Sequence, residues 1–319
     1  MIFSLFLSLF LIFAPQVAQS PAGVKQENPE EEDVVEYVST PAEEDSASIT
    51  GLPRAKPFPP EKKEGSTSLG IETTARAALV LDEGTGAILF EKNSDEKLSL
   101  ASLTKLMTAL VFLEKETDWD RNIKLIKADD REGGIFYARS PEEVTVDDLF
   151  NMMLVGSINN AAVALARSTG ESEEEFIAEM NAKAESFRMS ATFVDQTGLG
   201  VENQGTARDV AKLLATALRE EKIEEAVVQK RYVFSPAKSQ KIYYIKSTDE
   251  LLWSFLNEEP YKLIGGKTGY IEEAGYNLAI EVERGGHKII VVVLGSATAE
   301  DRFKEAKGLA DWTFENYRW

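Results

Sequence analysis

The 319-residue sequence contains no cysteine and only one histidine, His287. Without cysteine the chain can form no disulfide, no thiolate nucleophile and no cysteine-ligated metal site, and one histidine cannot build a multi-histidine zinc centre. His287 follows a Gly285-Gly286 turn and opens a strand-like segment, which favours a solvent-facing strand histidine. We therefore expect no metal ion or other cofactor, and a hydrolase built on this chain should work without histidine.

Clustered positive charge is also missing. The chain has 35 Lys and Arg against 54 Asp and Glu, which gives a formal net charge of −19 at pH 7. Affinity for a phosphate backbone depends on clustered basic residues, so we expect no nucleic-acid partner. The hydrophobic fraction of 43% is ordinary for a globular protein with a core.

The N-terminal segment resembles a targeting signal. Residues 2–14 are apolar apart from two serines, and Pro15 and small residues follow up to Ser20. This pattern is typical of a secretory signal peptide and is shorter than the roughly 20 apolar residues of a membrane span. Because no Lys or Arg precedes the apolar run, residues 1–20 are expected to be a signal peptide or, alternatively, an uncleaved N-terminal anchor. Either interpretation predicts export.

Residues 21–70 are rich in Pro, Glu and Ser and include the acidic run Glu30-Glu31-Glu32-Asp33. Low hydrophobicity and excess charge predict a disordered, acidic, Pro-rich linker. The simpler interpretation is that this linker only separates the folded domain from the N-terminal segment; the alternative is that it binds a specific partner. Ordered patterning begins near Ile71, so residues 71–319 are expected to form one folded domain.

The pattern within this domain predicts strands at both ends and helices between them. A hairpin is expected over 77–81 and 87–91, and later strands over 263–269, 276–282 and 288–294. Helices are expected over 102–115, after Thr145, over 160–168 and 171–187, and over 299–317. This order predicts an α/β (α+β) fold, with one antiparallel sheet flanked by helices and a helical subdomain.

Ser102 and Lys105 are the first candidates for chemistry. They lie three residues apart at the start of an apolar helix, so their side chains share one face. A lysine can act as the base for a serine hydroxyl if burial and neighbouring positive charge lower its pKa toward ~7–8. The partial positive charge at the helix N-terminus favours developing oxyanion character.

A second segment tests how specific this spacing is. Ser235-Pro236-Ala237-Lys238 has the same pattern, which chance alone produces about once per 300 residues. It lies in a polar stretch with no apolar helix behind it. Context therefore favours Ser102.

Two further motifs follow in order, Ser157-Ile158-Asn159 and Lys267-Thr268-Gly269. The three motifs together resemble those of penicillin-binding proteins and class A β-lactamases. The S-x-N middle motif is similar to that of the low-molecular-mass D-Ala-D-Ala carboxypeptidases, peptidase family S11. The likeness extends from about Ile71 to the C-terminus and includes residues 101–108, 192–199, 206–209 and 274–277.

The resemblance implies roles for these residues, each with a plainer alternative. Ser102 is the expected nucleophile, Lys105 the base and Ser157 a proton relay. Asn159 would hold Lys105 and the substrate, although Ser157 and Asn159 could be helix caps. The expected substrate-binding residues are Asn159, Lys267, Thr268, Gly269, Tyr270 and Arg302.

The plainer alternatives for the two cations are a surface strand lysine for Lys267 and a surface salt bridge for Arg302, the latter slightly favoured. Gly266 and Gly269 would let a substrate backbone lie against the strand. The family also implies an oxyanion hole made by the backbone N–H groups of Ser102 and Tyr270.

Two departures from the family stand out. Tyr270 occupies a position where the family often has histidine, which puts substrate preference in doubt. The sequence given ends at Trp319, directly after the last expected helix, so we expect no β-rich C-terminal domain and any membrane tether should be N-terminal.

The resemblance implies a serine-type D-Ala-D-Ala carboxypeptidase acting on peptidoglycan stem peptides, with β-lactams as inhibitors. It would lie in the periplasm or at the outer face of the cytoplasmic membrane. A DD-endopeptidase is the main alternative. A class A-like β-lactamase should have S-D-N and an Ω-loop glutamate, which are not evident, and an inactive peptidoglycan-binding protein would not need the intact motifs.

Overall fold

The computed structural model describes residues 58–115, 118–131 and 133–319. The expected signal peptide or anchor and most of the expected linker fall on residues 1–57, outside the described residues. Among the helices in the described ranges, none combines the length and the apolar character needed to cross a membrane.

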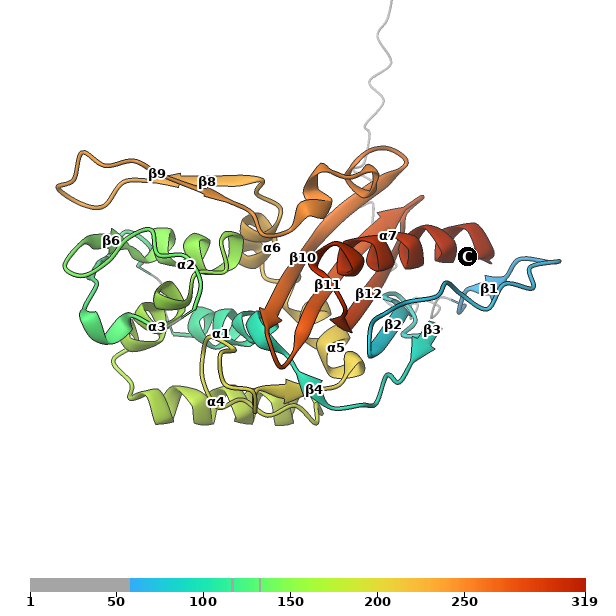
Figure 1. Ribbon diagram of the computed structural model, residues 1–319, viewed down its shortest axis with the longest axis horizontal. Coiled ribbons are helices and arrows are strands. Elements are labelled where there is room, and N and C mark those ends of the chain that lie inside the picture. Colours follow the sequence, from blue (N-terminus) through green and yellow to red (C-terminus); the bar gives the residue numbers. More distant parts are fainter. Residues whose placement is uncertain (1–57, 116–117, 132) are drawn as a thin grey trace, which may run out of the picture. The chain divides into compact units, whose positions relative to one another are not determined.

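A five-stranded antiparallel sheet organises the domain (Figure 1). Its strand order is β10 (Tyr261–Ile271), β11 (Gly275–Arg284), β12 (His287–Ser296), β2 (Ala77–Asp82) and β3 (Ile88–Lys92). The N-terminal hairpin and the three C-terminal strands, far apart in sequence, thus share one sheet. The expected fold class and these expected strands are confirmed.

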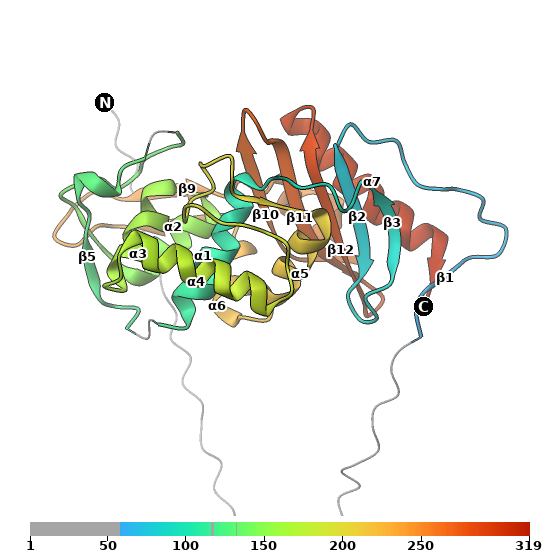
Figure 2. The ribbon, with the colours of Figure 1, turned by 90° about the horizontal axis from the view of Figure 1, so that it is seen from below.

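Helices cover both faces of the sheet (Figure 2). Alternate residues of β12 point to opposite faces, as strand geometry requires. Ile289, Val291 and Val293 share one apolar core with α7 (Ala299–Asn316). Ile290, Val292 and Leu294 share the other core with α5 (Ala207–Ala217) and the remaining helices.

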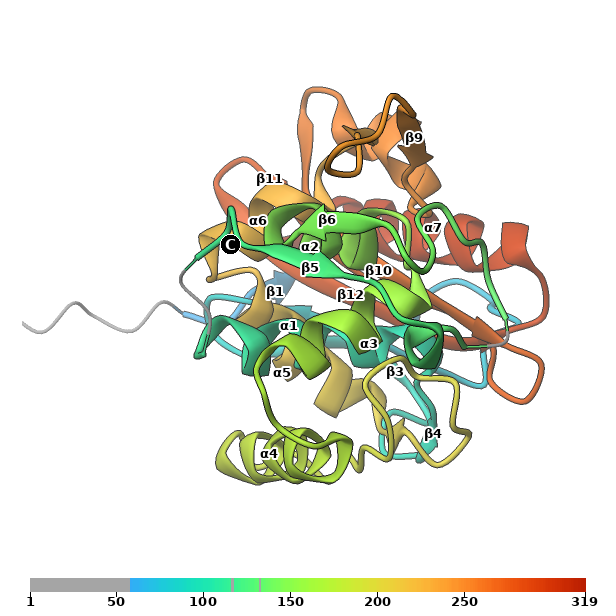
Figure 3. The ribbon, with the colours of Figure 1, turned by 90° about the vertical axis from the view of Figure 1, so that its left-hand side faces the viewer.

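The second core continues into a helical subdomain (Figure 3). It contains α1 (Thr104–Leu113), α2 (Val146–Val155), α3 (Asn159–Ser168), α4 (Glu173–Ser186) and α6 (Glu221–Val227). Thr145 caps α2 as expected, because its Oγ1 accepts a hydrogen bond from Asp148 N at 3.0 Å. Two short strand pairs lie beside these helices: β4 (Leu98–Ser99) with β7 (Gln204–Gly205), and β5 (Asn122–Lys124) with β6 (Glu143–Thr145).

The structure contains elements that the sequence pattern did not predict. A hairpin, β8 (Arg231–Phe234) and β9 (Tyr243–Lys246), packs against α2. Each strand has only four residues, too few for periodicity to be distinguished from chance. The helix expected from Ser102 begins at Thr104, and a 3₁₀ turn (Ala101–Leu103) precedes it.

The ordered chain begins before the expected boundary at residue 71. β1 (Glu61–Lys62) pairs with β13 (Tyr317–Arg318), and Trp312 Nε1 donates a hydrogen bond to Ser68 Oγ at 2.7 Å. These contacts join segments about 250 residues apart, so local composition could not predict them. His287 is exposed on β12 and stacks on Trp319 with ring centroids 5.2 Å apart, as a solvent-facing histidine should be.

Candidate active site

The three motifs meet at one cleft of about 480 Å³. Ser102 lies in the 3₁₀ turn before α1, Ser157 and Asn159 lie at the break between α2 and α3, and the Lys267 motif lies on β10. The residues that line the cleft are Ser102, Gly133, Gly134, Ile135, Gly156, Ser157, Asn159, Leu199, Thr248, Thr268, Gly269, Tyr270, Ile271, Glu272 and Arg302. Lys105 and Lys267 are buried beside it.

Three oxygen atoms surround the amine of Lys105. Its Nζ donates to Asn159 Oδ1 at 2.7 Å and to the Thr197 carbonyl at 2.6 Å, and lies 2.9 Å from Ser102 Oγ. An amide oxygen and a backbone carbonyl can only accept, so they fix two N–H bonds of the amine. In the neutral amine the remaining lone pair then faces the Ser102 hydroxyl.

The protonation state of Lys105 follows from its burial. The side chain has no exposed surface, and this desolvation lowers the pKa of Lys105 to about 7, although the charge of Asp195 partly opposes the shift. A large fraction of the amine is therefore neutral near pH 7. Lys105 can accept the proton of Ser102.

Asn159 and Ser157 do not cap a helix. The N-cap of α3 is Ile158, and no side chain caps it. The Asn159 amide instead joins Lys105 to the loop at Gly133, because its Nδ2 donates to the Gly133 carbonyl at 2.8 Å. Of the two interpretations, the structure therefore favours positioning of Lys105 over helix capping.

Ser157 faces the second lysine. Lys267 is 1% exposed, so the alternative of a surface strand lysine is wrong. Its Nζ donates to Ser157 Oγ at 2.8 Å, and burial, with smaller effects of the Lys105 and Arg302 charges, lowers the pKa of Lys267 well below its usual value. Ser157 holds a positive φ of 58°, a strained backbone conformation of the kind that is common at functional sites.

The glycines of β10 serve a different purpose from the one expected. A Cβ on Gly269 would lie 2.8 Å from the Leu100 carbonyl oxygen, and one on Gly266 would lie 2.8 Å from the Ala279 carbonyl oxygen. Both positions are crowded by the chain's own backbone, so the prediction that they make room for a substrate backbone is wrong. Gly269 allows β10 to approach the turn that carries Ser102.

Arg302 lies in the cleft rather than in a surface salt bridge. Its Nη1 donates to the Gly269 carbonyl at 3.1 Å, and its guanidinium lies over the rings of Tyr276 and Phe303, 5.5 Å and 4.7 Å from their centroids. Tyr270 stacks on Tyr276 at 4.3 Å. The aromatic rings and a carbonyl thus fix the guanidinium beside Tyr270.

The sequence pattern of the D-alanyl-D-alanine carboxypeptidase family matches residues 62–298. The chain belongs to this family. It is 30% identical to a D-alanyl-D-alanine carboxypeptidase of Bacillus subtilis over 80% of the chain and 66% of that protein, and 35% identical to one of Escherichia coli over 75% of the chain and 61% of that protein. The chain thus spans about two thirds of the length of these carboxypeptidases.

Other relatives are named endopeptidases. A D-alanyl-D-alanine endopeptidase of Pseudomonas aeruginosa is 28% identical over 84% of both chains. Among solved structures, a Streptomyces DD-transpeptidase matches with a TM-score of 0.71 and 27% identity, over 77% of this chain and 99% of that one. A cefotaxime-bound penicillin-binding protein of Listeria monocytogenes matches with a TM-score of 0.67 and 32% identity, over the same shares.

Asp195 is a site residue to which sequence reasoning gave no role, although its segment carried the family likeness. Its carboxylate accepts hydrogen bonds of 2.6–2.7 Å from the backbone N–H groups of Thr197, Gly198 and Gly200, and from the side chains of Thr197 and Asn203. These bonds shape the loop that presents the Thr197 carbonyl to Lys105. Hydrogen bonds to the carboxylate outweigh desolvation and lower the pKa of Asp195.

Asp249 was also missed, because neither its spacing nor its neighbours form a motif. It is 3% exposed, its Oδ1 accepts from Leu251 N at 2.9 Å, and its Oδ2 has no hydrogen-bond partner among the described residues. Burial raises the pKa of Asp249 to about 6, even though Arg302 and Lys267 favour the ionised form. This carboxyl group therefore interacts electrostatically with both cationic substrate-binding candidates, Lys267 and Arg302. No cluster of three metal-ligating side chains occurs within the described ranges.

Proposed function

We propose that this protein is a penicillin-binding serine carboxypeptidase that removes the terminal D-alanine from peptidoglycan stem peptides through an acyl-enzyme on Ser102. The observation that carries the proposal is the buried Lys105 amine, with a pKa lowered to about 7, 2.9 Å from Ser102 Oγ. A serine beside such an amine is an activated nucleophile. The named activities of the relatives support the substrate class, and the cefotaxime complex of the Listeria protein supports β-lactams as inhibitors.

Acylation would begin with attack of Ser102 Oγ on the carbonyl carbon of the penultimate D-alanine. Lys105 takes the hydroxyl proton, and the backbone N–H groups of Ser102 and Tyr270 would stabilise the oxyanion, as the family resemblance implies. When the C–N bond breaks, the departing amine needs a proton. Ser157, hydrogen-bonded to Lys267, is suited to deliver it as a relay: Ser157 gives its hydroxyl proton to the amine and regains the proton that Lys105 took from Ser102, which leaves Lys105 neutral for deacylation.

The substrate's terminal carboxylate has two candidate partners, Lys267 and Arg302. Arg302 reaches the cleft with a guanidinium held on aromatic faces, a geometry that suits bidentate binding of a carboxylate. Lys267 is buried with a lowered pKa, so a carboxylate beside it would favour its charged form. Deacylation would follow when Lys105 removes a proton from water that attacks the ester.

An endopeptidase that cuts cross-links is a second candidate, because relatives with that name match over 84% of their length. Digestion of purified muropeptides separates the two activities. We expect release of free D-alanine from pentapeptide monomers, and none from the Ser102→Ala variant. Separation of cross-linked dimers without free D-alanine would instead establish the endopeptidase.

We also propose that the protein is exported, with the catalytic domain in the periplasm or at the outer face of the cytoplasmic membrane, where it would act in cell-wall biogenesis and cell shape. The apolar residues 2–14 and the polar segment after them support this. Alkaline phosphatase fused after residue 70 should be active. An inactive but stable fusion would contradict export, and the mass of the mature protein would distinguish a cleaved signal from an N-terminal membrane tether.

A further inference from the structure

The outer face of the β8–β9 hairpin carries two positive charges without counter-ions. Arg231 and Lys246 are directly opposite each other in the strand pair, both are exposed, and neither forms an ion pair with another described residue. Like charges in directly opposite positions destabilise a strand pair. The arrangement is notable in a chain whose net charge is −19.

The two faces of the hairpin differ. On the inner face Tyr232, Phe234 and Tyr243 form an aromatic row, and Tyr232 Oη donates to Asp148 of α2 at 2.8 Å. The outer face alternates with it and carries Val233 and Tyr244 beside the two cations. The hairpin is anchored by one face, so the other is free to contact a ligand.

The cations border a hollow of about 400 Å³, lined by Arg231, Lys246, Glu250 and Trp253. Lys246 Nζ lies 5.0 Å from the ring centroid of Trp253, whose side chain is 42% exposed. The hollow therefore combines two positive charges, one carboxylate and an accessible aromatic face. This combination suits an anionic ligand that also has a ring or aliphatic surface to cover the indole.

The hollow is continuous in sequence with the active-site cleft. One short segment, residues 246–250, contributes to both sites. Thr248 lines the cleft, while Lys246 and Glu250 line the hollow. Thr268 Oγ1, on the Lys267 strand, donates to Thr248 Oγ1 at 2.6 Å. Thr248 is two residues from both Lys246 and Glu250, so residues of the hollow adjoin, along the chain, the cleft that would hold the end of a long substrate.

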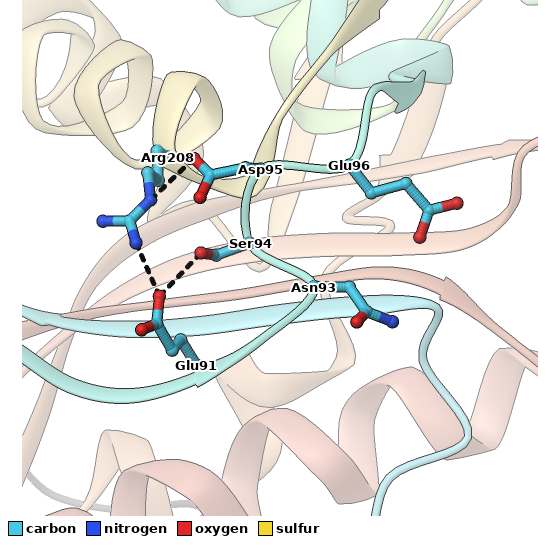
Figure 4. Close-up of a pocket in the computed structure, with 6 residues that line it drawn as sticks. All are labelled: Glu91, Asn93, Ser94, Asp95, Glu96 and Arg208. Carbon is cyan, nitrogen blue, oxygen red and sulfur yellow. Dashed lines mark hydrogen bonds and ion pairs between the residues drawn. The ribbon is translucent and has the colours of Figure 1, made fainter.

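A second hollow provides a comparison, because its cation, Arg208, forms ion pairs within the protein. Arg208 of α5 lines a hollow beside the edge strand β3 and contacts Glu91 at 2.6 Å and Asp95 at 2.9 Å (Figure 4). Its charge is neutralised by the protein itself. Arg231 and Lys246 share their hollow with Glu250 but form no ion pair with it or with any other described residue, which distinguishes this hollow from a structural ion-pair cluster.

We infer that Arg231, Lys246 and Trp253 form an accessory site for polymeric peptidoglycan, which binds carboxylate-bearing parts of the polymer beyond the D-Ala-D-Ala end. This inference rests on the proposed function, because it takes the polymer as the substrate. The site adds affinity for the polymer and leaves the chemistry at Ser102 unchanged. A short peptide that ends in D-Ala-D-Ala does not reach it.

The test compares polymer binding with turnover of a short peptide. Binding is measured by co-sedimentation with insoluble peptidoglycan in a Ser102→Ala background, which prevents digestion, at low and high salt. The Arg231→Gln/Lys246→Gln variant should bind about tenfold more weakly at low salt, a change of about 1.4 kcal/mol. The difference should shrink in high salt, because exposed charges are screened. With Ser102 intact, the same double variant should hydrolyse an acetylated Lys-D-Ala-D-Ala tripeptide at the wild-type kcat/KM.

Three variants make the result specific. Arg219→Gln/Arg318→Gln removes two exposed charges elsewhere, which pair with Glu83 and Glu61, and should bind the polymer like the parent protein. Arg231→Lys/Lys246→Arg keeps both charges and should retain binding. Glu250→Gln removes the carboxylate from the hollow and should strengthen binding.

Parent-like binding by Arg231→Gln/Lys246→Gln, or an equal loss in the control pair, would overturn the inference. The inference would also be overturned if a synthetic peptide of residues 26–45 bound to the Arg231 and Lys246 site more strongly than peptidoglycan does. The ligand of the site would then be the chain's own acidic segment. Failure of the wild-type protein to hydrolyse the tripeptide would instead count against the proposed function.

Discussion

Two of the serine-x-x-lysine segments in the chain, those at Ser102 and Ser235, share a spacing but differ in burial and in the contacts of both side chains. Lys105 is buried, and its Nζ lies 2.9 Å from Ser102 Oγ. Ser235 and Lys238 lie in the loop between β8 and β9. There Ser235 Oγ donates to the Lys241 carbonyl at 2.8 Å, while the Lys238 side chain is 87% exposed and reaches Glu143 at 3.5 Å.

The difference shows that spacing supplies only proximity. A helix-like turn brings Ser102 and Lys105 to one face, and the packed subdomain around α1 then removes water from the amine. The hairpin loop turns Ser235 and Lys238 toward different partners and leaves the lysine in water. Desolvation, which requires the rest of the fold, turns a lysine into a base at neutral pH.

The largest expected effect comes from removing each serine in turn. The wild-type protein should form a stable acyl adduct with a penicillin, Ser102→Ala should form none, and Ser235→Ala should react like wild type. Intact-mass spectrometry followed by peptide mapping measures the adduct and its position. An adduct that persists in Ser102→Ala, or maps to Ser235, would show that the buried segment is not the nucleophile.

Removing each lysine tests the role of desolvation. Lys105→Ala should slow penicillin acylation by about 10²–10⁴, the usual contribution of a general base, and Lys238→Ala should change it little. In the wild type the acylation rate should rise as pH passes about 7, because the neutral form of Lys105 is the base. Stopped-flow acylation between pH 5 and 9 measures this rise. A rate that is flat across this range would contradict the assignment of Lys105.

The third effect separates the two cations of the cleft. Lys267→Ala should lower kcat/KM for a D-Ala-D-Ala peptide by about 10²–10³, or roughly 3–4 kcal/mol, because it removes a preorganised electrostatic partner. Lys267→Arg keeps the charge but not the shape, so partial activity is expected. Arg302→Ala should mainly raise KM. The Arg302 guanidinium packs on the rings of Tyr276 and Phe303 and lines the cleft, where it would bind the substrate carboxylate. Circular dichroism confirms folding, and activity of Lys267→Ala within about threefold of wild type would refute this site geometry.

The sequence predicted the parts of this site that local pattern encodes. Ser102, Lys105, Ser157 and Lys267 lie in short motifs, and the strands β10 to β12 have long apolar runs that periodicity detects. The roles of Gly266 and Gly269 were predicted wrongly, because what a missing Cβ makes room for depends on which backbone packs there.

The sequence could not predict burial by distant segments. Asp195 and Asp249 have no spacing relative to the catalytic residues that would reveal them, and each acquires its environment only when its loop packs beside α1 or β10. The Ser68 to Trp312 contact was missed for the same reason, whereas the β8–β9 hairpin was missed because each of its strands has only four residues. Tertiary contacts decide the first three of these features.

The smallest expected effect extends the comparison of buried and exposed groups from lysine to carboxylic acid. Burial raises the pKa of Asp249 from 3.8 to about 6, so its ionisation opposes folding. The contribution of this carboxyl group to wild-type stability should therefore be fully present below pH 3.8 and lost as pH rises through about 6. Asp249→Asn removes the ionisation and keeps an oxygen for the hydrogen bond from Leu251 N.

The free energy of unfolding of Asp249→Asn, relative to wild type, should rise between pH 4 and pH 8 by at most about 3 kcal/mol, the equivalent of about two pKa units. Urea denaturation at pH 4, 6 and 8 measures the change, and using the change with pH removes any constant effect of the substituted amide. Glu259→Gln is the matched control, because Glu259 is exposed and is not among the charges that shift the pKa of Asp249, so this variant should show no such change. A pH-independent difference for Asp249→Asn would mean that Lys267 and Arg302 already keep this carboxylate ionised, and that burial does not govern its charge.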